Sequence, residues 1–219
     1  MTRFIPQLIH LLAACILMLS FAMISQRRIA SLINLFALQG AALVAASVLL
    51  GYAEGNPDLY VSAALTLALK VVLIPWLLYR VIRKLNVRWD VEPLVNVPIL
   101  MIVGIGLVIF SFSLALPVSR LSASIAGGSL GIALACVLLS FMMMITRSRA
   151  VPQVIGFLSM ENGLIFAATA ATNGMPMIVE FGIALDVLVG ILILGVFMFQ
   201  IREQFDSLDI HNLEQLKED

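Results

Sequence analysis

The stretch from Pro98 to Leu116, PILMIVGIGLVIFSFSLAL, decides the class of fold, because it contains no charged side chain. A helix rises about 1.5 Å per residue, so about 20 such residues cross a hydrocarbon core of about 30 Å. Six further stretches of similar character run from Ile5 to Ser25, Ile29 to Gly51, Tyr60 to Ile82, Ser124 to Thr146, Pro152 to Ala171 and Met177 to Ile201. We therefore expect an all-α, polytopic membrane protein with about seven transmembrane helices.

The composition supports the same class. Of the 219 residues, 62% are hydrophobic and 12% are charged, whereas soluble domains have roughly 45–50% and 25%. The net charge is zero, which argues against a nucleic-acid partner because counterion release needs a basic face. Cys15 and Cys136 lie in apolar stretches without the spacing of a disulfide framework or a metal site, and we interpret both as buried apolar residues.

The basic residues indicate how the chain is oriented. When the loops alternate between the two sides, one side receives Arg27, Arg28, Arg80, Arg83, Lys84, Arg88, Arg147, Arg149, Arg202 and Lys217. The other side receives only Arg3 and Arg120. Cytoplasmic loops are enriched in lysine and arginine, so we expect the N-terminus outside and the C-terminus in the cytoplasm. Arg3 also precedes the first apolar stretch, but this stretch exceeds the core of about 7–15 residues typical of a signal peptide.

The longest polar break divides the chain into two membrane parts. We expect a three-helix half over residues 1–90, a four-helix half over 91–203 and a polar cytoplasmic tail over 204–219. No internal repeat relates the halves by eye, and no pair of matched broken helices is visible. Both observations argue against a stand-alone secondary transporter, although that reading stays open as a lesser alternative.

Four ionisable residues interrupt the apolar stretches: Lys70, Glu161, Glu180 and Asp186. Near the centre of a bilayer each costs about 2.5–3.5 kcal/mol on insertion scales. Glu161 is too far from either helix end for its short side chain to reach water, so it must face protein or internal water. Lys70 precedes Pro75, which cannot donate to the carbonyl of residue 71 and favours a kink there.

These charged residues have two possible interpretations. A single ion pair, Lys70 with Glu161 or with Asp186, could simply hold helices together. One pairing leaves two carboxylates over, however, and acids with a base at similar depth are what a proton relay requires. Burial raises and a nearby ammonium lowers the pKa of a carboxylate, so such a set can be tuned around neutral pH. Weaker polar positions, expected to bridge helices by hydrogen bonds, are His10, Asn34, Gln39, Ser111, Ser113 and Asn162.

No motif for nucleotide binding, hydrolysis or metal catalysis occurs, and no metal or other cofactor is expected in this chain itself. Three segments do resemble a known family: MENG at residues 160–163, VEFGIALD at 179–186 and LDIHNL at 208–213. They are similar to hydrogenase-4 component E, a membrane subunit of formate hydrogenlyase-type and related energy-converting hydrogenases. The last spans also resemble the K-type small subunit of complex I and the C subunit of multisubunit cation/proton antiporters.

The resemblance implies a role in a large complex. In the related small subunits, neighbouring helices each carry one glutamate, which Glu161 matches and Asp186 matches as an aspartate. It implies antiporter-like membrane partners, a peripheral hydrogenase arm holding nickel–iron and iron–sulfur centres, and a place in the prokaryotic cytoplasmic (inner) membrane. The leading hypothesis is a non-catalytic subunit that contributes Glu161, Asp186, Glu180 and Lys70 to a proton or sodium path. The alternative is a purely structural subunit with static ion pairs.

Overall fold

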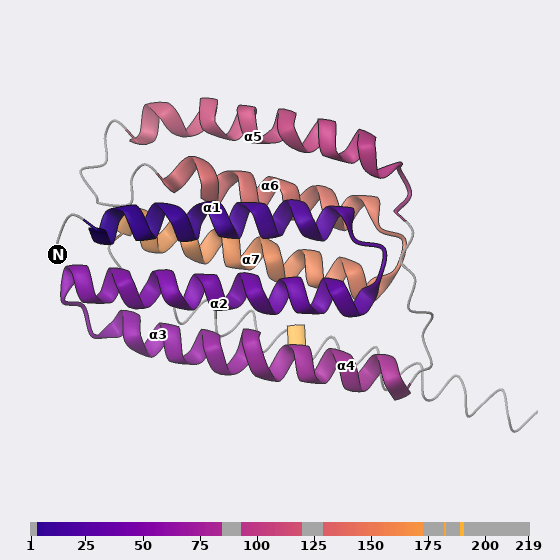
Figure 1. The fold of residues 1–219 in the computed structure, drawn as a ribbon, viewed down its shortest axis with the longest axis horizontal. Coiled ribbons are helices and arrows are strands. Elements are labelled where there is room, and N and C mark those ends of the chain that lie inside the picture. The colour runs from indigo at the N-terminus through magenta and orange to yellow at the C-terminus, as the bar shows by residue number, and fades with distance from the viewer. Residues whose placement is uncertain (1–3, 85–92, 120–128, 173–181, 183–188, 191–219) are drawn as a thin grey trace, which may run out of the picture.

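The computed structural model describes residues 4–84, 93–119, 129–172, 182 and 189–190, and its elements are helices. In chain order they are α1 (Phe4–Ser25), α2 (Ile29–Glu54), α3 (Asp58–Thr66), the π-helix η1 (Leu67–Leu73), α4 (Ile74–Lys84), α5 (Val97–Ser119), α6 (Leu130–Thr146) and α7 (Ala150–Thr172). Short connections join α1 to α2, α2 to α3 and α6 to α7, so the helices of each pair run antiparallel, side by side (Figure 1).

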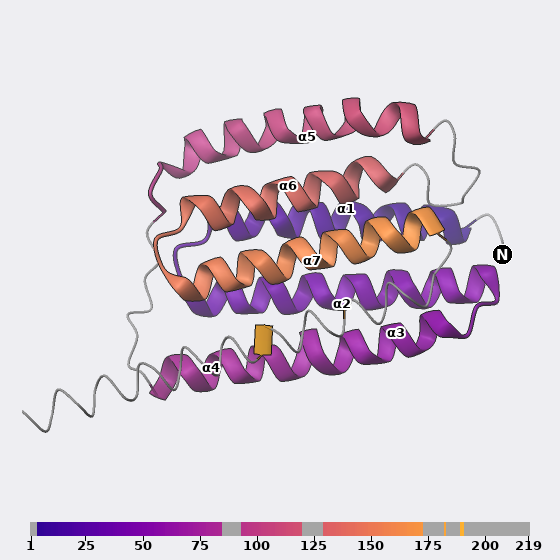
Figure 2. The same ribbon diagram turned by 180° about the vertical axis from the view of Figure 1, so that it is seen from behind.

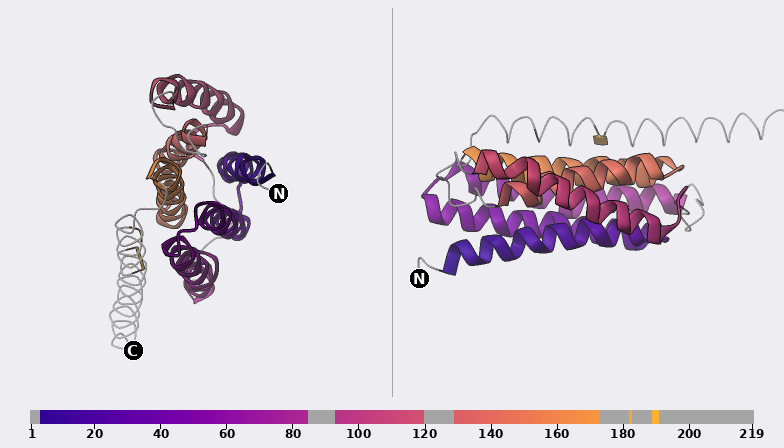
Figure 3. Two further views of the ribbon diagram at one scale, coloured as in Figure 1. Left: turned by 90° about the vertical axis from the view of Figure 1, so that its left-hand side faces the viewer. Right: turned by 90° about the horizontal axis from the view of Figure 1, so that it is seen from above.

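Four helices form the centre of the bundle. α1 packs against α2 and α6, and α7 packs against the same two helices. α5 covers the outer side of α6, while α3, η1 and α4 follow one another along α2 (Figure 2). Viewed end on, α5 and α4 lie at opposite edges of this arrangement (Figure 3). The predicted boundary near residue 90 lies outside the described residues, but helices from both sides of it pack together.

Five of the seven predicted spans are confirmed as helices long and apolar enough to cross a membrane. They cover Phe4–Ser25, Ile29–Ala53, Asp58–Arg80, Val97–Pro117 and Ala150–Thr169. α6 is also an apolar helix, but it covers only Leu130–Thr146 of the predicted 124–146 span, of which residues 124–128 lie outside the described residues. The seventh predicted span, 177–201, lies outside the described residues except at 182, 189 and 190.

The helices of the central group pack closely. A Cβ atom added to Gly163 of α7 would lie 3.0 Å from the Val137 Cγ2 and 3.1 Å from the Val137 backbone nitrogen. Such an atom would have to displace α6, so glycine at this position sets the separation of α6 and α7. Cys136, whose Cβ would lie 3.3 Å from the added atom, belongs to a buried apolar cluster with Ala133 and Phe166.

Pro75 disturbs its helix in a specific way. Residues Leu67–Leu73 form a π-helix, and the Ile74 backbone N–H donates to the Leu69 carbonyl, five residues earlier. The proline cannot donate to the carbonyl of residue 71 and its ring crowds that carbonyl, so a wider turn replaces the simple kink that the sequence suggested. Lys70 lies at the centre of this wider turn.

The basic residues gather at one end of the bundle. α1, α4 and α6 end there, and α2, α5 and α7 begin there (Figure 1). The described basic residues near these helix ends are Arg27, Arg28, Arg80, Arg83, Lys84, Arg147 and Arg149. These seven residues, all predicted to lie on one side of the membrane, thus share one end of the bundle, and the side of the membrane stays a prediction.

Candidate functional site

Lys70 and Glu161 form a buried ion pair in the middle of the bundle. The Lys70 Nζ lies 3.1 Å from the Glu161 Oε1, and the two residues are 0% and 1% exposed. Lys70 comes from η1 and Glu161 from α7, each near the midpoint of its apolar span. Of the two partners that the sequence left open for Lys70, the described structure thus pairs it with Glu161.

A chain of neutral polar side chains lies beside this pair. The Asn162 Nδ2 donates to the Gln39 Oε1 at 3.2 Å, and the Gln39 Nε2 donates to the Ser20 Oγ at 2.9 Å. The Ser20 hydroxyl in turn donates to the Ile16 carbonyl at 3.0 Å. All three side chains are buried, so α1, α2 and α7 are joined by hydrogen bonds that have no competition from water.

A second polar contact joins α6 to α7. The Ser140 and Ser159 hydroxyls lie 2.7 Å apart and are buried. Ser159 precedes Glu161 by two residues, so this contact lies next to the ion pair along α7. Sequence reasoning overlooked Ser20, Ser140 and Ser159, because a single hydroxyl within an apolar stretch is common; of the three, Ser159 had a signal, its position at the middle of a span.

Of the six polar residues predicted to bridge helices by hydrogen bonds, five do so and one does not. Gln39 and Asn162 bridge helices as expected, and Asn34 does so by accepting from the Tyr79 hydroxyl at 2.8 Å. His10 Nδ1 lies 3.1 Å from the Ser129 Oγ, and the Ser111 hydroxyl lies 3.1 Å from the Gly131 carbonyl of α6. The prediction for Ser113 is wrong: its exposed hydroxyl donates to the Ile109 carbonyl of its own helix.

Gly182 places a further part of the chain beside the ion pair. A Cβ atom added to Gly182 would lie 3.8 Å from the Glu161 Oε1 and 3.1 Å from the Ile165 Cδ1. The backbone at Gly182 therefore passes directly by the Glu161 carboxylate. The two other predicted site residues, Glu180 and Asp186, lie outside the described residues, so their positions relative to Glu161 stay predictions.

Arg147 was expected to be a loop charge, but its side chain is 1% exposed. Its Nη2 donates to the Ile24 carbonyl at 2.7 Å and the Gln26 carbonyl at 2.8 Å, at the C-terminal end of α1. Burial lowers the pKa of the guanidinium, but arginine stays charged in proteins. This cation satisfies carbonyls that the end of a helix leaves without partners.

The chemistry available to the central site is proton exchange. The Lys70 Nζ and the Glu161 Oε1 are 3.1 Å apart, close enough for a proton to pass directly between them. Within the described ranges, no group of three or more histidine, cysteine, aspartate or glutamate residues could hold a metal ion.

Known proteins of two kinds are similar to this chain over nearly its full length. The chain is 32% identical over 212 residues to the uncharacterized protein Rv0085 of Mycobacterium tuberculosis, with 96% of each chain covered. It is 22% identical over 210 residues to hydrogenase-4 component E of Escherichia coli K12, covering 96% of this chain and 97% of that one. The same protein of Shigella flexneri matches to the same extent. No protein-family model matches, and no solved structure shows significant similarity.

Proposed function

The chain belongs to the same family as Rv0085 of Mycobacterium tuberculosis, and on this premise we propose that it is a membrane subunit of a hydrogenase-type, redox-driven complex. It contributes intramembrane charges to a proton or sodium path and carries out no redox chemistry itself. Full-length similarity to hydrogenase-4 component E supports the type of complex. The site residues of this proposal are Lys70, Glu161, Glu180 and Asp186.

The buried Lys70–Glu161 pair is the observation that carries the proposal. Both charges lie at the middle of apolar spans, where each alone costs several kcal/mol. Replacing a buried ion pair by apolar side chains is often neutral or stabilising, so packing alone gives little reason for these two charges. A pair that can exchange a proton at 3.1 Å gives a functional reason.

The path extends beyond the pair through the stretch that contains Gly182. Gly182 passes beside Glu161, and its neighbours Glu180 and Asp186 supply carboxylates on either side of it in sequence. When Glu161 takes or releases a proton, the net charge of the pair with Lys70 changes. Because the interior has a low dielectric constant, this change alters how readily a nearby carboxylate binds a proton. Electron transfer in partner subunits, which would hold the nickel–iron and iron–sulfur centres, drives this cycle.

The proposal includes a topology. The chain crosses the bilayer seven times, with the N-terminus outside and the tail over 204–219 in the cytoplasm of a prokaryotic cell. The clustering of basic residues at one end of the bundle supports this orientation, because basic loops stay cytoplasmic. Antiporter-like membrane subunits and a peripheral hydrogenase arm are the proposed partners, in line with the resemblance of the last spans to small subunits of complex I and of cation/proton antiporters.

A Glu161→Gln variant tests the ion path. Glutamine keeps the size and hydrogen-bonding capacity of the side chain but cannot ionise, so we expect a complex that assembles and transfers electrons without coupled ion pumping. Assembly is measured by copurification of partner subunits and by nickel content, and pumping by pH change in membrane vesicles. Glu54→Gln, at the C-terminal end of α2, is the matched control. Unchanged pumping in an assembled Glu161→Gln complex contradicts the proposal.

A purely structural subunit is the second candidate, and the same pair favours it, because Lys70 and Glu161 join η1 to α7. The double variant Lys70→Met/Glu161→Met separates the two functions. A structural role predicts that removing Glu161 or Lys70 alone impairs assembly rather than pumping. The double variant removes both charges while keeping apolar volume, so a structural role predicts normal assembly and normal pumping for it. An ion path predicts normal assembly and no pumping.

A further inference from the structure

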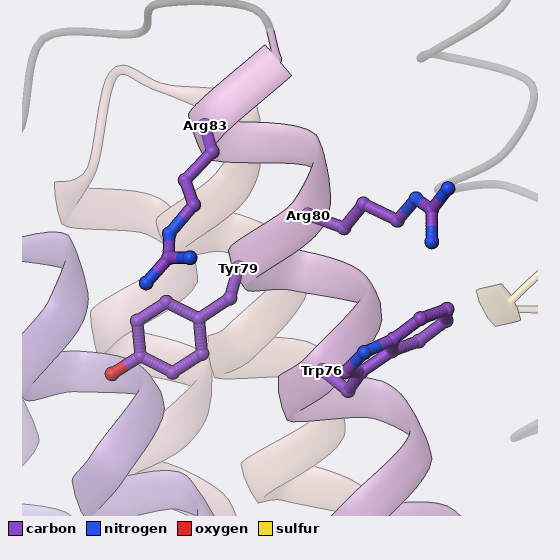
Figure 4. A pocket seen from close by; sticks show the side chains of 4 residues that line it. All are labelled: Trp76, Tyr79, Arg80 and Arg83. Atoms are coloured by element: carbon purple, nitrogen blue, oxygen red, sulfur yellow. The ribbon is translucent and has the colours of Figure 1, made fainter.

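A second polar feature lies at the C-terminal end of α4, far along the helix from Lys70. Trp76, Tyr79, Arg80 and Arg83 line a pocket of about 380 Å³ (Figure 4). Their spacing of three, four and seven residues places them along one side of the helix. The Tyr79 hydroxyl donates to the Asn34 Oδ1 at 2.8 Å, which fixes this wall of the pocket against α2.

The pocket has the charge to bind a phosphate group, because two of its four lining residues are arginines. The Arg80 Cζ lies 5.2 Å from the centre of the Trp76 ring, so the guanidinium is held over the indole. Arg83 extends beside Tyr79 (Figure 4). Among the described residues no carboxylate forms a salt bridge with either arginine. Planar guanidinium groups bind phosphate oxygens by two parallel hydrogen bonds.

The surface below the pocket is apolar and exposed. Val72, Leu73 and Trp76 are 61%, 47% and 54% exposed, and they precede the arginines on the same continuous helix. By the helical rise, Arg80 lies about 6 Å and Arg83 about 10 Å farther toward the helix end than Trp76. The arginines thus lie nearer the helix end than the exposed apolar side chains. A ligand with a phosphate joined to long apolar chains would contact both groups, whereas a free phosphate would contact only the arginines.

We propose that this pocket binds the headgroup of an anionic phospholipid, with its acyl chains along Trp76 and Val72. The arginines belong to the basic end of the bundle, and basic pockets at the cytoplasmic ends of membrane helices attract anionic headgroups. Trp76 supplies the amphipathic ring that is favoured at the level of the headgroups.

Fluorescence quenching of Trp76 tests this binding. The chain has two tryptophans, so a Trp89→Phe version of the full chain leaves Trp76 as the reporter. It is reconstituted into phosphatidylcholine vesicles with a minor fraction of phosphatidylglycerol, with bromine on the acyl chains of one lipid or the other. At equal bromine content we expect brominated phosphatidylglycerol to quench Trp76 more strongly, because each arginine enriches an anionic lipid about fivefold, the equivalent of about 1 kcal/mol.

Variants and inorganic phosphate complete the test. Arg80→Gln/Arg83→Gln should abolish the preference for phosphatidylglycerol, while Arg27→Gln/Arg28→Gln, which changes two exposed arginines at the same end of the bundle, should keep it. Far-ultraviolet circular dichroism checks that the variants stay helical. Equal quenching by both lipids overturns the proposal. So does loss of the preference on adding inorganic phosphate at constant ionic strength, because the pocket would then bind phosphate alone.

Discussion

Gly40 of α2 lies directly against Lys70 of η1. A Cβ atom added to Gly40 would lie 3.5 Å from the Lys70 Cβ and 3.4 Å from the Val71 Cγ2. The missing side chain lets the π-helix approach α2 closely, and Lys70 then extends past α2 to Glu161 on α7. The position of the ion pair is therefore set by the close approach of two backbones as well as by charge.

A large side chain at residue 40 should separate the ion pair. Gly40→Leu is expected to displace η1 and to reduce coupled pumping by the complex, whereas Gly40→Ala makes only ordinary van der Waals contacts and should be tolerated. Gly106→Leu is the control, because a Cβ at Gly106 meets nothing within 4 Å. Equal pumping by the two leucine variants contradicts this account of how Lys70 is positioned.

Removing one charge of the pair should cost more than removing both. Lys70→Met or Glu161→Met leaves an uncompensated buried charge, for which about 3–5 kcal/mol is typical. The double variant should recover most of that loss. Reversible unfolding of the purified chain in mixed micelles measures the four free energies. Additive effects of the two single substitutions would show that the groups do not interact energetically.

The hydrogen-bonded chain beside the pair should also contribute to stability. Gln39→Leu leaves Ser20 and Asn162 buried without their Gln39 partner, which should destabilise the chain by about 1–3 kcal/mol. Ser113→Ala removes an exposed hydroxyl that bonds only within its own helix and should change little. The same unfolding assay compares them, and a similar effect of both substitutions contradicts the role of Gln39.

The sequence predicted the helices better than their contacts, and the reason is physical. Continuous apolar composition identifies a span, as the five confirmed helices show. The same composition does not indicate which side of a helix faces its neighbours, because each helix has apolar side chains on all of its sides. For this reason the sequence identified Lys70 as buried but could not choose between Glu161 and Asp186 as its partner.

Two features could not have been read from the sequence at all. The π-helix depends on how the chain before Pro75 relieves the crowding at residue 71, and a proline alone does not specify that geometry. Arg147 follows α6 as an ordinary basic loop residue would. Its burial arises because α1 ends beside it, at Ile24 and Gln26, more than a hundred residues earlier.

Arg147 should be the most important of the basic residues for stability. Arg147→Gln removes the cation that contacts two carbonyls at the end of α1, and we expect a loss of about 1–3 kcal/mol. Arg28→Gln, at an exposed position of the same end, should change stability by less than about 0.5 kcal/mol. Comparable losses for both variants would show that general positive charge, and not the buried contact, stabilises this end.

The pH dependence of a conservative variant separates charge from shape. The effect of Arg147 itself should be constant from about pH 6 to pH 9, because arginine stays charged throughout. The burial that lowers the pKa of Arg147 should also hold the pKa of a lysine there below its unfolded value of about 10.4. The unfolded state then binds more protons, so Arg147→Lys should gain stability as pH rises through the folded pKa toward that value. The measurement is the free energy of unfolding of both chains from about pH 6 to about pH 10. If the two curves run parallel, the charge at residue 147 is not buried.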